Sequence, residues 1–375
     1  MTYSEAIIRR ISNRTYLPVP LSPEESAELS KVISQCNEAG GLRFQLLTGF
    51  SKPFSGMKSY GIFSGVTNLI ALVGPESDPN LDEKCGYYGE KVVLSATAMG
   101  LGTCWVAATY DRTVCRDLTG EGERLCCVVA VGRVPENPGA KEKLIRGVMQ
   151  RKSKPLAELS KGVGPAWFMS GIAAVQRAPS ARNLQPVRFC YQGDHVAAEI
   201  VEHHGLSLVD LGIAKYHFEV GAHGGVWTWG DGGIFTKAEE EKSCGAVIVQ
   251  DRPEGRQYLL AQHGASHWSF PKGHVEGRER ETETAEREIL EETGLTVDID
   301  TGFREVVTYY PKAGVIKDVV FFLATPTGGV EHAQEEEIRQ LGWFPFEEAQ
   351  SLVTFVTDIE VLKAAETYLN KKRKQ

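Results

Sequence analysis

A run of acidic residues at fixed spacing, residues 273–295, constrains the fold of this chain more than any other feature. It reads GHVEGRERETETAEREILEETGL. Because its second half is rich in residues that favour helices, we predict a helix over residues 284–293, ended by the glycine that follows in a left-handed conformation. On that helix Glu288, Glu291 and Glu292 are spaced i, i+3 and i+4, so their carboxylates share one face.

Three carboxylates on one helix face repel one another unless a cation lies between them. Hard divalent cations that prefer oxygen, Mg²⁺ or Mn²⁺, relieve this repulsion and also bind substrate phosphate. Two such ions can activate a water molecule and neutralise charge on a leaving oxygen. The alternative is a solvated acidic helix face, which would not explain the fixed glycines or Arg287. The pattern therefore predicts a metal-dependent hydrolytic site.

The whole run resembles the complete Nudix box, with no departure at any fixed position. The resemblance implies an α/β/α sandwich and a hydrolase of nucleoside diphosphate-type bonds. It also implies a set of site residues: the metal ligands Glu288, Glu291, Glu292 and the carbonyl of Gly273, with Arg287 orienting the carboxylates and Glu279 assisting from the preceding loop. Which glutamate acts as general base varies across the family and stays unassigned.

The flanking sequence narrows the substrate class. Residues 269–276, SFPKGHVE, resemble the W-x-x-P-K-G-H-x-E run of asymmetric diadenosine tetraphosphate hydrolases. Two predicted strands, residues 304–310 and 317–324, flank a turn and would bring Tyr309 or Tyr310 near Lys317. In those relatives a tyrosine at this place stacks on the base and a lysine binds phosphate. The alternative for Tyr310 is an ordinary strand aromatic in the core. The substrate-binding candidates are Lys272, His274, Tyr310 and Lys317.

A later acidic cluster, Glu335-Glu336-Glu337, precedes another predicted strand. Some Nudix enzymes use a glutamate from this region on the metal. A direct role for Glu336 therefore stays open beside the simpler account, an exposed acidic loop.

The chain divides near residues 230–243, which are rich in glycine and charge and poor in apolar residues. A length of 375 residues suggests two or three domains. We predict one domain over residues 1–235 and a second, Nudix-like domain over residues 241–375.

The upstream region contains one internal repeat. Residues 89–105 and 212–227 share one plan, in which an apolar helix is followed by glycines and a tryptophan. A single pair of this kind suggests two related halves, about residues 1–160 and 161–235.

The beginning of the chain carries an R-x-S-x-R pattern at Arg10, Ser12 and Arg14. Two guanidinium groups and a hydroxyl suit the phosphate of a flavin mononucleotide. A basic, solvated helix is the alternative for this pattern taken alone. The R-x-S-x-R pattern resembles the start of nitroreductase-family flavoproteins.

Three further stretches resemble the same family. Residues 87–105 are similar to its long apolar helix and G-L-G-x-x-W turn. Residues 128–134 and 151–156 are similar to its closing strand and basic R-K-x-L segment. Residues 178–189, APSARNLQPVRF, are close to A-P-S-x-x-N-x-Q-P-W-x-F, although Val187 stands where tryptophan is usual.

The order of these motifs departs from the family, because the A-P-S-x-x-N segment comes late and the second half lacks an R-x-S-x-R. Family members are normally homodimers that hold each flavin between two subunits. We therefore predict an α+β flavoprotein domain whose halves form a pseudo-dimer within one chain, either as a monomer or in a homodimer. One FMN site is expected, with NAD(P)H as electron donor, and with the residues Arg10, Ser12, Arg14, Pro179, Ser180, Asn183 and Gln185.

Composition limits the partners. A formal net charge of -8 argues against broad nucleic-acid binding but leaves a nucleotide substrate open. Eight cysteines without a CxxC pair predict reduced thiols and neither a zinc cluster nor a thioredoxin motif. We find no signal-peptide run and no stretch near the roughly 20 apolar residues of a spanning helix, so a cytoplasmic protein without a membrane segment is expected.

The motifs together predict a Mg²⁺-dependent hydrolase of dinucleoside polyphosphates fused to an FMN-dependent oxidoreductase. In one alternative the upstream region only binds flavin or dimerises. In another the hydrolase acts on FAD, NADH or oxidised nucleotides. A degenerate domain that senses nucleotide without cleaving it is a further alternative, against which the intact glutamates argue.

Overall fold

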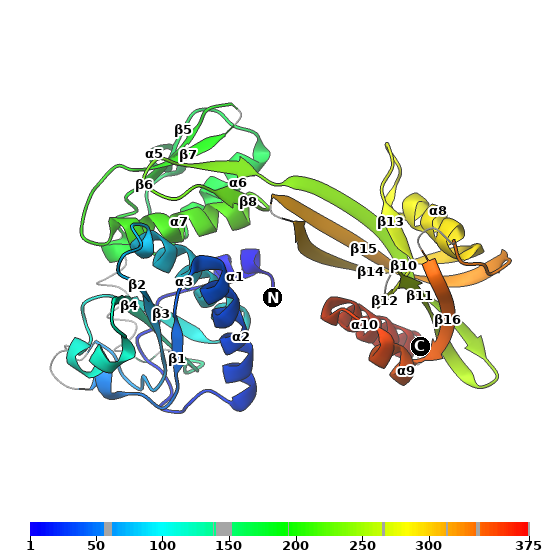
Figure 1. The fold of residues 1–375 in the computed structure, drawn as a ribbon, viewed down its shortest axis with the longest axis horizontal. Helices are drawn as coiled ribbons and strands as arrows, with labels where there is room; N and C mark the ends of the chain where they lie inside the picture. The colour runs from blue at the N-terminus through cyan, green and yellow to red at the C-terminus, as the bar shows by residue number, and fades with distance from the viewer. Residues whose placement is uncertain are drawn as a thin grey trace. The chain divides into compact units, whose positions relative to one another are not determined.

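The computed structural model of the chain describes residues 1–55, 62–137, 139, 152–193, 195–264, 267–312, 314–334 and 338–373. Its contacts divide the chain into two compact units, Met1–Lys237 and Ala238–Gln375, which are described separately (Figure 1). Both units combine helices with largely antiparallel sheets, which confirms the α+β class. Within the residues described, no helix has the length and apolarity needed to cross a lipid bilayer.

The first unit is built from two halves. The first half contains α1 (Tyr3–Arg9), α2 (Pro23–Gly40), β1 (Gln45–Leu47), η1 (Lys52–Phe54), β2 (Leu69–Pro75), α3 (Leu81–Ala98), β3 (Gly102–Val106), η3 (Arg112–Leu118) and β4 (Glu123–Gly132). The second half contains α5 (Leu156–Leu159), β5 (Ser160–Lys161), α6 (Ala166–Val175), η4 (Ala181–Asn183), β6 (Val187–Tyr191), β7 (Val196–Ile200), α7 (Ser207–Gly221), β8 (Gly225–Trp227) and β9 (Gly233–Lys237).

The two halves repeat one topology. In the first half β2, α3, β3 and β4 follow one another, and the sheet order is β1-β2-β4-β3. In the second half β7, α7, β8 and β9 follow one another, and the order is β6-β7-β9-β8, with β5 added beside β6. The neighbours within each four-strand order are antiparallel. Trp105 in β3 and Trp227 in β8 therefore lie on corresponding strands.

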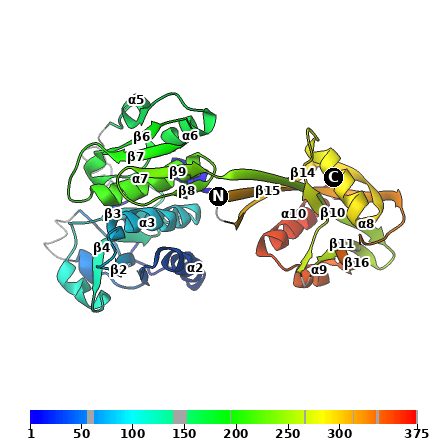
Figure 2. The ribbon, with the colours of Figure 1, turned by 45° about the horizontal axis from the view of Figure 1, so that its top comes forward.

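Helices α3 and α7 lie side by side between the two sheets (Figure 2). A Cβ on Gly86 would lie 2.1 Å from a carbonyl oxygen of α7, and a Cβ on Gly212 would lie 1.9 Å from the carbonyl oxygen of Glu83. These glycines therefore allow the two backbones to approach closely. The fully buried Lys215 of α7 forms an ion pair with Glu83 of α3 across this α3–α7 seam.

The second unit is a sandwich of three layers. Its elements are β10 (Glu239–Arg252), β11 (Gly255–His263), β12 (His267–Ser269), β13 (Lys272–His274), α8 (Glu281–Thr293), β14 (Leu295–Lys312), β15 (Val315–Gly329), β16 (Ile338–Pro345), α9 (Phe346–Leu352) and α10 (Val356–Lys372). The strands form a mixed sheet of order β12-β11-β10-β15-β14, in which β10 and β15 are parallel. In addition, β13 pairs with β10, and β16 pairs with β11.

Alternate residues of β10 face the two helical layers, because side chains alternate along a strand. Ala246 and Ile248 pack in one core with α8, whereas Val247 and Val249 pack in another with α10. This arrangement confirms the predicted α/β/α sandwich, and it presents α8 beside the short strand β13.

Candidate functional site

Helix α8 carries the acidic residues of the 273–295 run. It begins at Glu281, before the predicted Thr284, because the carboxylate of Glu283 accepts a 2.8 Å hydrogen bond from the backbone N of Arg280 and caps the first turn. It ends at Gly294 in the expected left-handed conformation, with φ of 71°.

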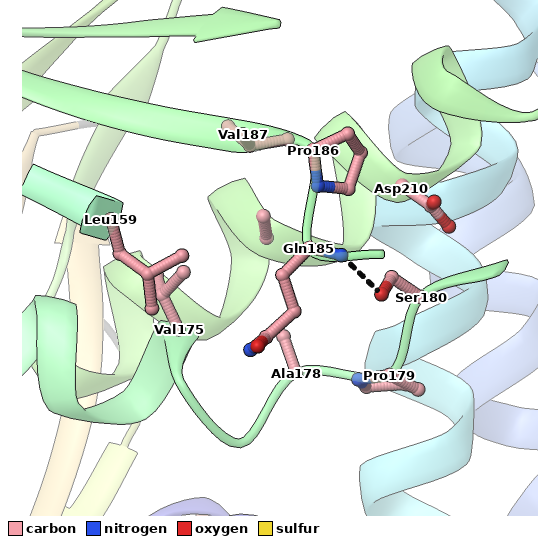
Figure 3. A pocket seen from close by; sticks show the side chains of 10 residues that line it. Leu159, Val175, Ala178, Pro179, Ser180, Gln185, Pro186, Val187 and Asp210 are labelled. Atoms are coloured by element: carbon pink, nitrogen blue, oxygen red, sulfur yellow. Dashed lines mark hydrogen bonds between the residues drawn. The ribbon is translucent and has the colours of Figure 1, made fainter. Parts of the chain in front are cut away.

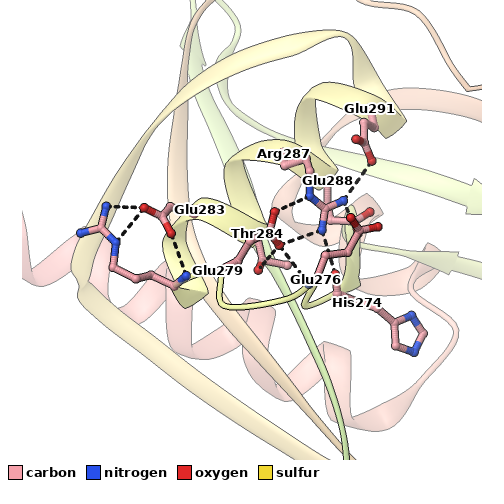
Figure 4. Close-up of polar contacts among 9 residues, drawn as sticks. His274, Glu276, Glu279, Glu283, Thr284, Arg287, Glu288 and Glu291 are labelled. Carbon is pink, nitrogen blue, oxygen red and sulfur yellow. Dashed lines mark hydrogen bonds and ion pairs between the residues drawn. The ribbon is translucent and has the colours of Figure 1, made fainter.

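Arg287 connects the helix with the loop before it (Figure 4). Its Nε and Nη2 donate to the two carboxylate oxygens of Glu279 at 2.8 and 3.0 Å. Its Nη1 donates to Glu288 at 2.9 Å and to Glu291 at 3.1 Å, and Nη2 also donates to the carbonyl of His274 at 2.8 Å. The hydrogen bonds from Arg287 hold the pKa of Glu279 at about 2. One guanidinium thus orients three carboxylates and the loop.

Two glutamates of α8 approach the backbone of β13. A Cβ on Gly273 would lie 2.0 Å from Cδ of Glu288, so this carboxylate occupies the space beside the glycine. Glu292 is 2% exposed, and its Oε2 accepts a 3.1 Å hydrogen bond from the backbone N of Lys272. The side chain of Glu291 is 49% exposed. The structure therefore places Glu288 and Glu292 at the junction of α8 and β13, whereas Glu291 is linked to Glu288 through Arg287.

The chemistry of this junction fits a hard divalent cation. Its donors are carboxylate and carbonyl oxygens, the ligands that Mg²⁺ and Mn²⁺ prefer. Among the residues that the structure describes, no three histidine, cysteine, aspartate or glutamate side chains converge into a preformed ligand set. Arg287 instead neutralises part of the carboxylate charge.

Two of the predicted phosphate-binding side chains, His274 of β13 and Lys317 of β15, lie on the strands that pair with β10 on its two sides. Nζ of Lys317 is 3.0 Å from Nε2 of His274. Because an ammonium group can only donate, this Nε2 accepts, and the imidazole proton lies on Nδ1. Glu241 lies 3.4 Å from Nε2 of His274 and 4.0 Å from Nζ of Lys317. Burial lowers the pKa of Lys317, against the opposing effect of Glu241.

Glu241 did not follow from sequence reasoning. It reaches the site because β10 and β15 pair in parallel and place Glu241 opposite Lys317. Tyr309 is also in register with Lys317, on the other neighbouring strand. The adjacent Tyr310 is 57% exposed, so it is not a core aromatic. Residues 335–337, with the candidate Glu336, lie outside the described residues.

The R-x-S-x-R residues of the first unit run along β3. Ser12 forms a parallel bridge with Thr103 of that strand, and Nη1 of Arg14 donates to the carbonyl of Ser12 at 3.4 Å. The side chain of Arg10 is 10% exposed, and its Nε lies 3.9 Å from Oε1 of Glu90. Within the described residues this buried Nε makes no hydrogen bond. A buried donor of this kind fits an anion-binding role.

The A-P-S-x-x-N segment forms a strained loop over residues 178–185. Arg182, Asn183 and Gln185 have φ of 53°, 52° and 45°. Such values are uncommon for residues other than glycine, and strain of this kind clusters at ligand sites. Oγ of Ser180 accepts a 2.9 Å hydrogen bond from the backbone N of Gln185 (Figure 3). The amide of Gln185 bonds to two backbone groups outside the loop, so Ser180 and Gln185 fix its shape.

A small pocket lies beside this loop (Figure 3). Its lining includes Pro179, Ser180, Gln185 and Asp210, and its volume of about 10 Å³ has room for one water molecule. A flavin ring does not fit inside it. Both oxygens of Asp210 accept from the backbone N of Ala181, at 3.0 and 3.1 Å. Burial raises the pKa of Asp210 to about 7, more than these bonds lower it.

Each flavin-candidate segment has a neighbour on β3. Ala178, which opens the A-P-S segment, clusters with Val209 and Ile213 of α7, and Trp105 of β3 packs against this cluster. Ser12 bridges to the same strand. The two motifs therefore lie near the same strand, one at Thr103 and the other at Trp105. Residue 151 of the basic segment, and most of the residues before it back to 138, lie outside the described ranges.

Comparisons with known protein families give two matches. The family described as "Putative TM nitroreductase" matches residues 2–222. The family described as "NUDIX domain" matches residues 242–364.

Individual relatives match in the same regions. The asymmetrical bis(5'-nucleosyl)-tetraphosphatase of Mus musculus is 38% identical over 126 residues, which cover 30% of this chain and 85% of the mouse protein. "Putative mutator protein MutT4" of Mycobacterium tuberculosis is 26% identical over 140 residues, or 35% of this chain, and the chain spans 56% of that protein. A crystal structure described as a "putative nitroreductase" from Thermotoga maritima matches 63% of this chain and 94% of its own chain, with 20% identity and a TM-score of 0.44.

Proposed function

Because the chain belongs to the TM nitroreductase family over residues 2–222 and carries a Nudix hydrolase domain over residues 242–364, we propose that it is a Mg²⁺- or Mn²⁺-dependent dinucleoside polyphosphate hydrolase fused to an FMN-dependent oxidoreductase.

The arrangement of Arg287, Glu288 and Gly273 carries the hydrolase proposal. Glu288, Glu291 and Glu292 and the carbonyl of Gly273 would hold the metal ions, which supply water activation and charge neutralisation when bound. Arg287 orients Glu288 and Glu291 through charge-assisted hydrogen bonds. It also draws the loop carboxylate of Glu279 towards the helix, where that residue would assist the ligands.

The substrate proposal rests on the cations beside the carboxylates. Lys272, His274 and Lys317 would contact the phosphate chain, since His274 and Lys317 already share a hydrogen bond across β10, which pairs with the strands of both. The exposed ring of Tyr310 would stack on a base. The mouse relative is named for a bis-nucleoside tetraphosphate, which is the substrate class we propose.

A substrate panel tests this part. Diadenosine polyphosphates, FAD, NADH and oxidised nucleoside triphosphates would be incubated with Mg²⁺, and products separated by chromatography. We expect a dinucleoside polyphosphate to be cleaved fastest, and Glu291→Gln to lose this activity. Glu283→Gln on the same helix is the control, because the carboxylate of Glu283 pairs with the exposed Arg280. Faster cleavage of FAD, NADH or an oxidised nucleotide would favour that alternative substrate instead.

The flavin proposal rests on donors from both halves. Arg10, Ser12 and Arg14 would bind the FMN phosphate, and the loop with Pro179, Ser180, Asn183 and Gln185 would border the ring. At the equivalent place in the first half, residues 41–44 alone join α2 to β1, which is too short for such a loop. One site per chain follows, within a single-chain pseudo-dimer. Titration with FMN should saturate at one per chain, and two sites or none would contradict it.

A non-catalytic flavin or dimerisation module is the second candidate for the first unit. The pocket beside Ser180 does not enclose a flavin ring, which favours the dimerisation module. Oxidation of NADPH or NADH with a quinone or nitroaromatic acceptor separates the two candidates, because the oxidoreductase turns over and the module does not.

A further inference from the structure

Four side chains meet at the α3–α7 seam. Glu90 of α3 and His217 of α7 are both fully buried. Oε1 of Glu90 lies 2.8 Å from Nε2 of His217, and its Oε2 accepts a 2.8 Å hydrogen bond from Nε1 of Trp105. Nε of Arg10 is 3.9 Å from that Oε1 and makes no hydrogen bond within the described part of the chain. The carboxylate is thus bonded through both oxygens, while the neighbouring guanidinium remains outside hydrogen-bonding distance.

The geometry also limits the protonation of His217. Its Nδ1 lies 3.0 Å from the carbonyl oxygen of Ala174, which can only accept, so Nδ1 carries a hydrogen. One further proton is shared between Nε2 and the carboxyl of Glu90. The pair is an imidazolium with a carboxylate when that proton is on nitrogen, and two neutral groups when it is on oxygen. In both states the pair has no net charge, which reduces the cost of burying Glu90.

This network connects the two segments assigned to the flavin. Arg10 opens the R-x-S-x-R pattern of the first half. Ala174, which accepts from His217, lies in the last turn of α6, shortly before the loop of residues 178–185. Trp105 donates to Glu90 and also packs against the apolar cluster that contains Ala178, at the start of that loop.

We propose that Glu90 and His217 form a positioning pair that keeps the guanidinium of Arg10 available to the phosphate of FMN. This inference rests on the flavin site proposed above. Because His217 and Trp105 engage both oxygens of Glu90, Arg10 is not drawn into a close ion pair with that carboxylate. A guanidinium that is not bonded to a carboxylate retains its planar set of donors for phosphate.

Loss of the imidazole would change this balance. A buried carboxylate without its partner strongly favours the nearest cation, which is Arg10. The guanidinium would move onto Glu90 and lose its bond to phosphate. A change of Glu90 to glutamine in the same protein would remove the attraction and release Arg10 again.

The affinity for FMN divided by the affinity for riboflavin measures the contribution of Arg10 to phosphate binding, since riboflavin lacks the phosphate. Both affinities would be obtained by quenching of flavin fluorescence with the full chain. In His217→Phe we expect the preference for FMN to fall roughly tenfold or more, the size of one charged hydrogen bond, with riboflavin binding unchanged. The double variant Glu90→Gln/His217→Phe should recover the preference.

Tyr87→Phe is the matched control. It removes a 2.5 Å hydrogen bond from Tyr87 to Glu219 across the same seam without touching Arg10, so the ratio should stay at the wild-type value. An unchanged ratio in His217→Phe, or a loss that Glu90→Gln does not reverse, would overturn the inference alone. A wild-type protein that binds FMN and riboflavin equally well would refute the phosphate assignment and this inference with it.

Glu90→Gln alone gives a test that does not depend on the folding of the His217 variant. Its amide oxygen can accept from Trp105 and its amide nitrogen can donate to Nε2 of neutral His217. We expect the preference for FMN to be retained or increased. A loss of preference would mean that the charge of Glu90 is needed to hold Arg10, which contradicts the proposal.

Discussion

A Cβ atom on Gly273 would lie 2.0 Å from Cδ of Glu288, so this strand residue and this helix residue fit together only because position 273 has no side chain. The contact couples the backbone of β13 to the position of a proposed metal ligand.

The variant Gly273→Ala should therefore displace Glu288 while leaving the fold of the second unit intact. Displacement of a ligand by about 1 Å is expected to lower kcat roughly a hundredfold. Steady-state kinetics with a dinucleoside polyphosphate and Mg²⁺ measures this, and thermal unfolding checks the fold. Gly205→Ala is the control, because a Cβ there meets no atom within 4 Å. Wild-type kcat in Gly273→Ala would show that the close contact has no part in the reaction.

Arg287→Lys tests whether a guanidinium is needed at the centre of the carboxylates. Lysine keeps the charge but cannot reproduce the paired bonds to Glu279 together with those to Glu288 and Glu291. We expect kcat to fall at least about tenfold and the Mg²⁺ concentration for half-maximal rate to rise. Arg280→Lys, at an exposed pair on the same helix, should leave both unchanged. Equal behaviour of the two variants would contradict an orienting role for Arg287.

Lys317→Met tests the phosphate side of the site. Because Lys317 bonds to His274 on the proposed phosphate side of the site, its loss should raise KM for a dinucleoside polyphosphate about tenfold, with a smaller change in kcat. Lys312→Met, near the end of the same hairpin, serves as the control. A fall in kcat at unchanged KM would instead place Lys317 in the chemical step.

Local patterns predict the hydrolase helix well, because helical periodicity depends on near neighbours in sequence. The spacing of Glu288, Glu291 and Glu292 is enough to place them on one face, and Gly294 is enough to end the helix. Long-range pairing is different. Glu241 reaches His274 and Lys317 only through the parallel pairing of β10 with β15, which no local pattern encodes.

The first unit shows the same limit. The repeated pattern of helix, glycine and tryptophan in residues 89–105 and 212–227 predicts two related halves. It does not identify the residues that contact one another between the halves. In the sequence, nothing distinguishes Glu90 and His217 from other polar residues of apolar helices. Their contact depends on how α3 packs against α7. The motif residue Gln185 was expected to border a flavin, yet its amide bonds to the backbone around the loop, a role that spacing alone does not reveal.

Asp210 should make the stability of the first unit depend on pH. Burial raises its pKa to about 7 in the folded chain, whereas an unfolded aspartate titrates near 3.8. Between these values the protonated Asp210 of the folded state holds more protons than the unfolded chain, so its contribution to stability is largest below about pH 4 and falls until pH passes 7. The difference corresponds to at most about 4 kcal/mol.

Asp210→Asn should flatten this profile, since the amide oxygen can still accept from Ala181 without a charge. Urea unfolding between pH 4 and 8 measures the slope. A residual slope is expected, because burial also raises the pKa of Glu219 to about 7, and His204 lies 3.3 Å from Asp210. A variant as pH-dependent as the wild type would show that Asp210 stays ionised in the folded chain.

The buried ion pair between Lys215 and Glu83 should fix the α3–α7 seam. Lys215→Met leaves Glu83 buried without its cation, a change that costs about 3–5 kcal/mol in the free energy of unfolding. Lys215→Met/Glu83→Met removes the uncompensated charge and should recover most of that loss, because two apolar side chains replace a pair whose desolvation offset its attraction. The exposed pair of Arg133 and Glu25 provides the control, and Arg133→Met should cost less than about 1 kcal/mol. If Lys215→Met cost no more than Arg133→Met in urea unfolding, solvent would have to reach Glu83 and the seam would be looser than its burial implies.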